Sequence, residues 1–199
     1  MAYTVIRQYT VETANADEAV RRAAAGFLPL IQQAPGFLSY RMIKADDGTL
    51  ITVSTFETRV QGEESIRMAA GWIKENLGQL LPNPPTVIGG EVLVRRVIDS
   101  EPRNFAVMRR YPKVTDITEA TRRVEEGLLP ILSKQPGFAS YSVLDPGDGS
   151  VVSLRSFRDR ASAEESSQEA GGWVRENLAE LLPDPPIVTS GEVVGGAHK

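Results

Sequence analysis

Short stretches rich in β-branched and aromatic residues alternate with longer stretches of helical spacing along this chain, and their order occurs twice. In the first half this pattern predicts the order βαββαβ, at Tyr3–Val11, Ala19–Gln33, Phe37–Ala45, Thr49–Glu57, Gly62–Leu81 and Thr86–Val97. In the second half it predicts the same order, at Phe105–Pro112, Ile117–Lys134, Phe138–Leu144, Ser150–Arg158, Ala163–Leu182 and Ile187–Val194. Asp47-Gly48 indicates a hairpin between the second and third strands, and Pro29 and Pro130 predict a kink or break in the first helix of each half.

The two halves are also related residue by residue. Residues 26–92 align without a gap on residues 127–193, always 101 positions apart, and 30 of these 67 pairs are identical. A period of this size is that of a domain, far above the about 20–50 residues of a solenoid repeat. We therefore expect two domains, residues 1–98 and 105–195, joined by a short polar stretch at 98–104 that contains Pro102.

A βαββαβ unit is the ferredoxin-like arrangement. Its helices lie on one face of the sheet, so the other face has to be covered, and two such units can cover each other. The linker of about seven residues reaches at most about 25 Å when extended, which keeps the two copies together. The predicted fold class is therefore α+β, with two tandem ferredoxin-like modules packed sheet to sheet as a barrel within one chain.

Charge and composition narrow the classes of function. The 199 residues include 22 Lys and Arg against 26 Asp and Glu, and the net charge of −4 is spread over both halves. The chain has neither the basic run typical of nucleic-acid binding nor an apolar run near the about 20 residues of a membrane span. It has no cysteine, which excludes disulfides and thiolate–metal sites and suits a reducing compartment. Since the N-terminal pattern is that of a strand and not of a leader, we expect a cytoplasmic protein.

A run of segments in each copy carries a resemblance to a known family. The first copy contains PGFLSYRM at Pro35–Met42 and DGTLITVSTFET at Asp47–Thr58, followed by a helix with Trp72 and then by LLPNPPTVIGGEV at Leu80–Val92, and this run resembles the antibiotic biosynthesis monooxygenase family. The resemblance extends from the first to the fourth strand of both halves. Members of that family are dimeric α+β barrels of about one module per subunit, so this chain is similar to a tandem fusion of two subunits. The family includes cofactor-free oxygenases of phenolic polyketides, quinol oxidases and haem-degrading enzymes.

The resemblance also implies a pocket between the sheet and the helices of each module, with a tryptophan and an asparagine on it. Trp72 and Asn76 are four residues apart on one helical face, and Trp173 and Asn177 repeat them. Asn76 and Asn177 are thereby implied as catalytic residues, and the two tryptophans as pocket walls. Many members have a histidine early in this helix, but the only histidine here is His198. Haem chemistry through a histidine ligand is therefore not expected.

The same residues have structural interpretations. Trp72 and Trp173 lie on apolar stripes, where aromatic side chains usually serve as packing. An amide on such a face must find hydrogen-bond partners. A ligand can supply them, and so can a strand or a loop, so both roles stay open for Asn76 and Asn177.

Polar residues of the first two strands are further candidates for substrate binding. Tyr40 and Tyr141 follow serines, so each tyrosine lies on the opposite face from its serine. The sequence does not show which face meets the helices. Arg7 and Arg109, on the first strands, are either polar groups of a pocket or interface side chains. We expect neither a metal nor a cofactor, because the sequence contains no metal-ligand spacing with histidine and no phosphate-binding glycine loop.

Two functions are left open. The resemblance implies a cofactor-independent monooxygenase acting on an aromatic, quinol or polyketide-like small molecule. The ionised form of such a substrate reacts with oxygen itself, and the protein desolvates it, orients it and stabilises its charge. The missing histidine favours the alternative, a non-enzymatic protein of the same fold that binds a small apolar or aromatic molecule or serves as a scaffold. In either case we expect no nucleic-acid or membrane partner, leave a homo-oligomer open, and note that fused copies need not keep equal sites.

Overall fold

The computed structural model describes residues 1–98 and 102–199, so part of the predicted linker, residues 99–101, lies outside the described residues. The first copy contains β1 (Tyr3–Thr10), α1 (Thr13–Arg22), η1 (Ala23–Phe27), α2 (Leu28–Gln32), β2 (Phe37–Ala45), β3 (Thr49–Phe56), α3 (Arg59–Asn76) and β4 (Thr86–Val97). The second copy contains β5 (Phe105–Tyr111), α4 (Ile117–Arg123), η2 (Val124–Leu128), α5 (Leu129–Leu132), β6 (Phe138–Asp145), β7 (Val151–Phe157), α6 (Arg160–Asn177) and β8 (Ile187–His198).

The chain divides into two compact units. Unit 1 comprises Met1–Glu91 together with Gly191–Lys199, and unit 2 comprises Val92–Ser190. The divisions fall inside β4 and β8, so each unit contains the end of the last strand of the other copy. The predicted modules, 1–98 and 105–195, thus describe the sequence repeat, while the compact units exchange these strand ends.

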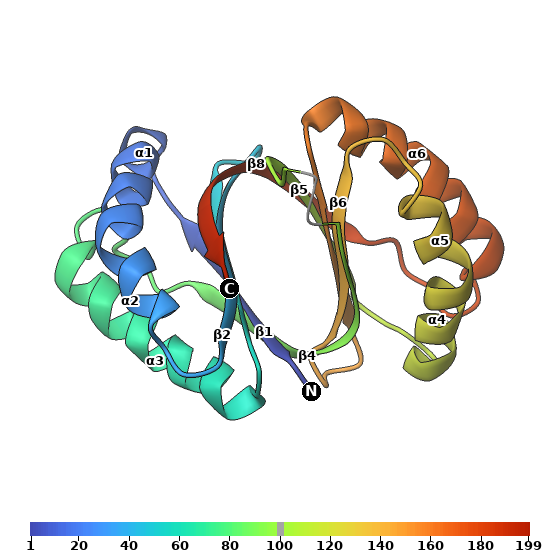
Figure 1. Ribbon diagram of the computed structural model, residues 1–199, viewed down its shortest axis with the longest axis horizontal. Helices are drawn as coiled ribbons and strands as arrows, with labels where there is room; N and C mark the ends of the chain where they lie inside the picture. Colours follow the sequence, from blue (N-terminus) through green and yellow to red (C-terminus); the bar gives the residue numbers. More distant parts are fainter. Residues whose placement is uncertain (99–101) are drawn as a thin grey trace. The chain divides into compact units, whose positions relative to one another are not determined.

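The sheet of unit 1 is antiparallel throughout. β1 pairs with β3 and with β4, and β2 pairs with β3 and with the end of β8. The predicted hairpin between the second and third strands is confirmed. The last strand continues to His198, beyond the predicted end at Val194, because Gly191–His198 pair with β2. Unit 2 repeats the pairing of β5 and β6 with β7, and Figure 1 shows the helices of each unit on one face of its strands.

The first helix of each copy contains a π-helical turn. The turn Ala23–Phe27 separates α1 from α2 and places Pro29 in the first turn of α2, where a missing backbone N–H leaves no hydrogen bond unmade. Val124–Leu128 does the same before Pro130. The irregularity expected from the prolines is present, but it lies on their N-terminal side. The helix also begins at Thr13, earlier than the predicted Ala19.

The second helix of each copy is displaced from its predicted bounds. In unit 1 it begins at Arg59 because Thr58 and Gln61 form a capping box, each side chain bonding the backbone N–H of the other. It ends at Asn76, five residues before the predicted Leu81, because Leu77 leaves the helical conformation with φ −127. The apolar spacing continues past Asn76, which explains why the sequence prediction was too long.

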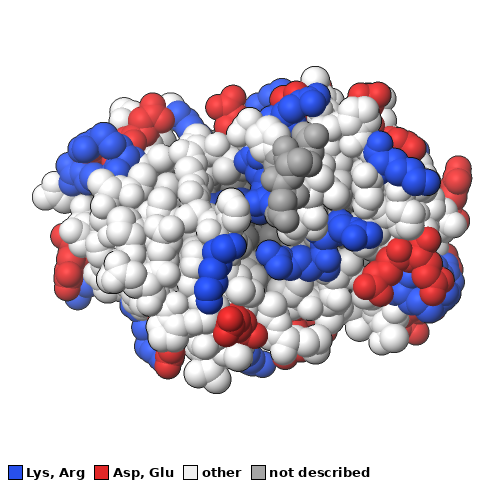
Figure 2. All heavy atoms as spheres, in the orientation of Figure 1, with Lys and Arg blue, Asp and Glu red and all other residues white. Residues whose placement is uncertain are grey.

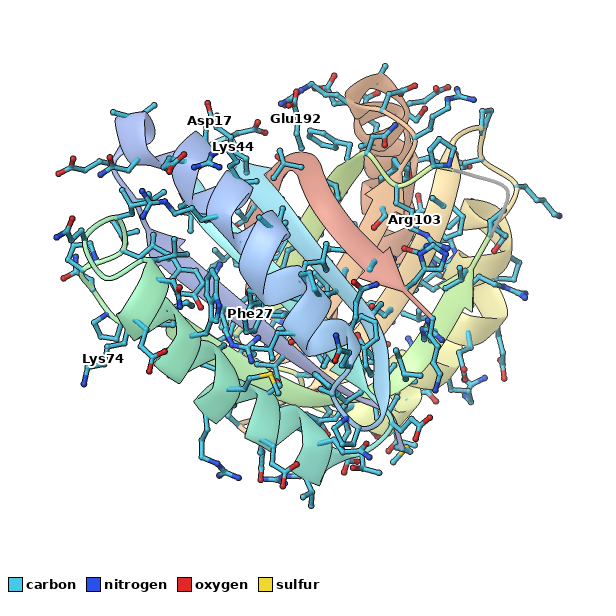
Figure 3. The ribbon with its side chains drawn as sticks, turned by 60° about the vertical axis from the view of Figure 1, so that its left-hand side comes forward. Asp17, Phe27, Lys44, Lys74, Arg103 and Glu192 are labelled. Atoms are coloured by element: carbon cyan, nitrogen blue, oxygen red, sulfur yellow. The ribbon has the colours of Figure 1, made fainter. Side chains whose placement is uncertain are left out.

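The hydrophobic core of each unit lies between the sheet and its helices. In unit 1, Tyr9, Tyr40 and Leu50 from three strands pack with Phe27 and Ala69 from the helices. Figure 3 shows Phe27 between its helix and the sheet. The strand faces left open by the sequence are therefore assigned: the tyrosines of β2 and β6 face the helices, and their neighbouring serines lie on the other face.

Candidate functional site

Each unit contains a cleft between its first strand, the end of its second helix and the proline-rich loop that follows. The unit 1 cleft has a volume of about 540 Å³ and is lined by Arg7 and Tyr9 of β1, Ile73 of α3 and residues 81–85. The unit 2 cleft has about 440 Å³ and the equivalent walls. Both volumes lie in the about 300–1,000 Å³ range of small-molecule sites. Most of the lining side chains are apolar, so the few charged groups on the walls determine which ligand fits.

Arg7 is the buried charge of the unit 1 cleft. Its side chain is 2% exposed. Nη1 donates to Ser54 Oγ at 2.9 Å and Nη2 donates to Ser65 Oγ at 2.8 Å, while Nε has no hydrogen-bond partner. Within residues 1–98 and 102–199 no carboxylate forms an ion pair with it. Burial lowers the pKa of Arg7, against opposing effects of Tyr9 and Tyr40. A guanidinium in this setting lacks a counter-charge.

Unit 2 has two such arginines. Arg109 of β5 is half-buried and donates from Nη2 to Ser167 Oγ at 2.8 Å. Arg155 of β7 is 2% exposed and lies 5.5 Å from the centre of the Tyr141 ring. Burial, and then the charge of Arg155, lower the pKa of Arg109 to about 10. In the part of the chain that the structure describes, neither arginine is ion-paired, and Asp184, the carboxylate of this cleft, lies exposed on the proline-rich loop.

The tyrosines beside these arginines are neutral at physiological pH. Burial raises the pKa of Tyr9 to about 12, although Arg7 opposes the shift. Burial likewise raises the pKa of Tyr40 and brings that of Tyr141 to about 12. Such hydroxyls donate hydrogen bonds to an anion but do not remove a proton from a substrate. Of these three tyrosines only Tyr9 lines a cleft, whereas Tyr40 and Tyr141 border the small interior voids, so the unit 1 cleft offers one cationic group and one hydroxyl donor from β1.

The tryptophans lie in the packing behind the clefts. Trp72 contacts the Phe27 ring at 5.5 Å between centres and covers Gly26. It borders an interior void of about 20 Å³, and the corresponding void of unit 2 has about 30 Å³. Voids of this size hold about one water molecule. Trp173 is not among the residues that line the unit 2 void, and a pocket wall at Trp72 and Trp173, as the resemblance implies, stays a prediction.

The asparagines end the second helices. Asn76 Nδ2 donates to the Trp72 carbonyl oxygen at 2.8 Å, and Asn177 Nδ2 donates to that of Trp173 at 2.8 Å. Asn76 is exposed and Asn177 is half-buried. The partner of each amide is thus its own helix, an option beyond the strand or loop that the sequence suggested. Their catalytic role stays a prediction, and the side-chain oxygens are the atoms left to perform it.

Sequence reasoning missed Arg155 and the proline-rich loops. Arg155 corresponds to Ser54 in the other copy, and the strand pattern Val151, Ser153, Arg155, Phe157 places it on the helix-facing side. The sequence therefore contained a signal for this residue, namely an arginine on the same face of a predicted strand as its apolar side chains. The loops were interpreted only as helix stops, because proline spacing does not reveal a concave surface.

The described residues contain no candidate metal centre and no candidate membrane span. Among residues 1–98 and 102–199, no group of three or more His, Cys, Asp or Glu side chains could hold a metal ion. None of the helices described here is long and apolar enough to cross a membrane. Figure 2 shows acidic and basic side chains intermixed over the visible face. The absence of a metal or cofactor remains a prediction.

Comparison with known proteins places the fold. No protein-family model matches the chain, and no curated protein matches its sequence. A candidate monooxygenase from Fusobacterium nucleatum subsp. nucleatum is 9% identical with a TM-score of 0.77, over 100% of this chain and 94% of that chain. An anthrone oxidase-like protein is 17% identical with a TM-score of 0.64, over 99% and 93%. A ferredoxin-fold protein of Listeria monocytogenes related to antibiotic biosynthesis monooxygenases is 8% identical with a TM-score of 0.55, over 98% and 95%.

These likenesses confirm the predicted fold class, a tandem α+β barrel of ferredoxin-like modules. The resemblance to antibiotic biosynthesis monooxygenases that the sequence suggested is thereby supported at the level of the fold. Identities of 8–17% show the fold alone. The chemistry has to be argued from the clefts.

Proposed function

We propose that this protein binds small aromatic anions in its two clefts and oxidises them with molecular oxygen, as a cofactor-independent monooxygenase. The observation that carries the proposal is the pair Arg7 and Arg109, equivalent strand arginines that line the two mostly apolar clefts and form no ion pair within the described residues. A buried charge without a partner is unfavourable by several kcal/mol in proteins. An anionic ligand supplies the missing charge, and an aromatic one fills the apolar remainder.

The substrate class follows from the chemistry of the walls. Neutral Tyr9 and the guanidinium of Arg7 stabilise a phenolate or enolate, which lowers the pKa of a bound phenol and enriches its ionised form. The ionised ring transfers an electron to oxygen, and the resulting radical and superoxide combine to a peroxide at a ring carbon. Loss of water from an anthrone-type peroxide leaves a new carbonyl. One oxygen atom thus enters the product and the other leaves as water, with all electrons supplied by the substrate.

The alternative is binding without turnover, which one observation favours. The tyrosine on the wall of the unit 1 cleft has a pKa raised to about 12, and the cleft arginine stays protonated at neutral pH. A protonated arginine and a neutral tyrosine bind a ligand that is already ionised. They offer no base that could remove a proton from a ligand of high pKa, so such a ligand would bind without reacting. Electron-rich quinols and anthrones, whose hydroxyl or ring protons are acidic, are therefore the substrates to test first.

Oxygen uptake with anthrone and dihydroxynaphthalene tests the proposal. The unmodified protein should consume oxygen, and Arg7→Met combined with Arg109→Met should slow consumption by about 10²-fold, the usual effect of removing a group that stabilises a developing oxyanion. Arg59→Met with Arg160→Met removes the equivalent exposed arginines at the starts of α3 and α6 and should leave the rate unchanged.

The predicted catalytic asparagines enter the same assay. Asn76→Ala with Asn177→Ala should affect the rate less than the arginine change if the guanidinium groups act on the substrate. A loss as large as that of the arginine variant would assign the reacting contact to the asparagines. No uptake by the unmodified protein with either substrate would refute the oxygenase and leave the binding function, which equilibrium dialysis of the same compounds measures separately.

A further inference from the structure

The two clefts differ most at one pair of equivalent positions. Ser54 of β3 in unit 1 corresponds to Arg155 of β7 in unit 2, since the copies are 101 residues apart. Both positions face the helices, in register with Tyr40 and Tyr141 on the neighbouring strands. The substitution therefore adds a buried positive charge on the side of the sheet that forms the cleft.

The added arginine rearranges the hydrogen bonds of its neighbour. In unit 1, Arg7 uses both terminal nitrogens on serines, Ser54 and Ser65. In unit 2 the first serine is absent, and Arg109 instead bonds Ser167, which stands where the first copy has Ile66. Its Nη1 is left without a hydrogen-bond partner. The exchange of a serine for an arginine thus leaves one guanidinium nitrogen of Arg109 unpaired as well as adding a second guanidinium.

The number of unmade hydrogen bonds sets the two clefts apart. Among the residues that the structure describes, Arg7 leaves only Nε unpaired in unit 1. In unit 2, Arg109 leaves Nη1 and Arg155 leaves Nε and Nη1. Both arginines line the same cleft of about 440 Å³. The void on the other side of Arg155, about 30 Å³, is too small for a ligand, so an anion that compensates this charge has to lie in the cleft.

A carboxylate matches such a pair better than a phenolate does. It presents two oxygens with about four lone pairs, which accept from two guanidinium forks at once, whereas a phenolate presents one oxygen. Since Arg109 and Arg155 repel each other, a fully charged ligand group relieves more unfavourable energy than a neutral hydroxyl. Lys74 and Arg175 line the two clefts at equivalent positions, so the clefts differ by one strand arginine, Arg7 alone in unit 1 against two in unit 2.

We infer that the unit 2 cleft is a binding site for aromatic carboxylates, built by Arg109 and Arg155, whereas the unit 1 cleft takes aromatic ligands with one anionic oxygen. The inference rests on the proposed use of the clefts as ligand sites, but not on the oxidation step. The two halves of the chain then serve different members of one ligand class.

Isothermal titration of the full chain with two probes tests this inference. The probes are naphthol and hydroxynaphthoate, which share the ring and the hydroxyl and differ in the carboxylate. Hydroxynaphthoate should bind at least about 10-fold more tightly, with one tight site per chain. Arg155→Ser, which gives unit 2 the serine of unit 1, should weaken hydroxynaphthoate about 10-fold or more and change naphthol less than about 3-fold. Arg155→Lys keeps the charge but lacks the planar guanidinium fork, so its affinity for hydroxynaphthoate should lie between those of the unmodified protein and Arg155→Ser.

The outcomes separate this inference from the proposed function. Equal binding of both probes, or Arg155→Ser that leaves hydroxynaphthoate affinity unchanged, would overturn the carboxylate site even where oxygen uptake is normal. Selective binding that Arg155→Ser removes supports the site even where no oxygen is consumed. Circular dichroism of both variants establishes that they are folded, and Arg7→Ser, which should leave the tight hydroxynaphthoate site intact, assigns that site to unit 2. Loss of the site in Arg7→Ser with retention in Arg155→Ser would place it in unit 1 and refute the assignment.

Discussion

Arg155→Met should make the protein more stable, because it removes a buried charge that has no counter-charge. Nε and Nη1 of Arg155 have no hydrogen-bond partner in the described part of the chain. A buried donor without a partner costs about 1–3 kcal/mol, so the two nitrogens cost roughly 2–6 kcal/mol together. Methionine keeps the apolar stem, but it loses the contact with the Tyr141 ring at 5.5 Å, which is worth about 0.5–2 kcal/mol. The midpoints of these two ranges give a rise in the free energy of unfolding of roughly 3 kcal/mol.

Urea unfolding and calorimetry measure this change. A gain of 1 kcal/mol raises the unfolding midpoint of a chain of this size by about 2–4 °C, so a rise of at least about 2 °C is expected. Arg158→Met removes an arginine whose side chain is 49% exposed and next to Asp159. That control should stay within about 0.5 kcal/mol of the parent. A loss of about 1 kcal/mol or more in Arg155→Met alone would refute the reasoning, since it would mean that the folded protein stabilises this guanidinium.

Three further predictions concern packing, capping and pH. Gly26→Ala should destabilise the fold by about 1–3 kcal/mol in urea unfolding, since the added Cβ would lie 2.7 Å from Trp72 Cζ2. As a control, Gly71→Ala should raise the unfolding free energy by about 0.5–1 kcal/mol, because the space around Gly71 in α3 is open. An unchanged or raised unfolding free energy in Gly26→Ala would contradict the close packing of Trp72 on Gly26. Thr58→Ala removes half of a capping box and should lower the unfolding free energy by about 0.5–2 kcal/mol; an unchanged value would show that the cap does not hold the helix start. Burial raises the pKa of Tyr9 and Tyr141 to about 12, so their contribution to stability is present below pH about 10 and is lost as the pH rises through about 12. Ultraviolet titration of tyrosinate, compared with Tyr9→Phe, checks this, and ionisation of Tyr9 near pH about 10 in the folded protein would count against it.

The repeat and the order of elements could be predicted because they depend on local chemistry. Neighbouring residues alone determine three of these signals: the alternation in β1 and β3, the turn at Asp47-Gly48 and the prolines that stop the second helix. The ends of the helices and strands were harder to predict from the sequence. The helix stops at Asn76 although its apolar spacing continues, and β8 is prolonged by pairing with β2, a contact between distant parts of the chain.

The candidate site could be predicted only in part. Arg7 and Arg109 were identified as polar strand residues, but their role depended on which sheet face meets the helices, and alternation leaves that choice open. Trp72 and Asn76 shared a helical face with the expected pocket, yet the tryptophan fills its space and the asparagine caps its own helix. The cleft itself is a concave surface formed by a strand, a helix end and a loop. Such a surface is a property of tertiary packing, which no local pattern encodes.

A crystal structure of the protein with bound bromohydroxynaphthoate shows whether the unpaired arginines form the binding site, because the anomalous signal of bromine locates the ring directly. We expect bromine density in the unit 2 cleft, between β5, the end of α6 and the loop at residues 183–186, with the carboxylate within hydrogen-bond distance of Arg109 and Arg155. Bromine density beside Trp173 and away from both arginines, or no density in either cleft at saturating ligand, would mean that the unpaired arginines do not form the binding site.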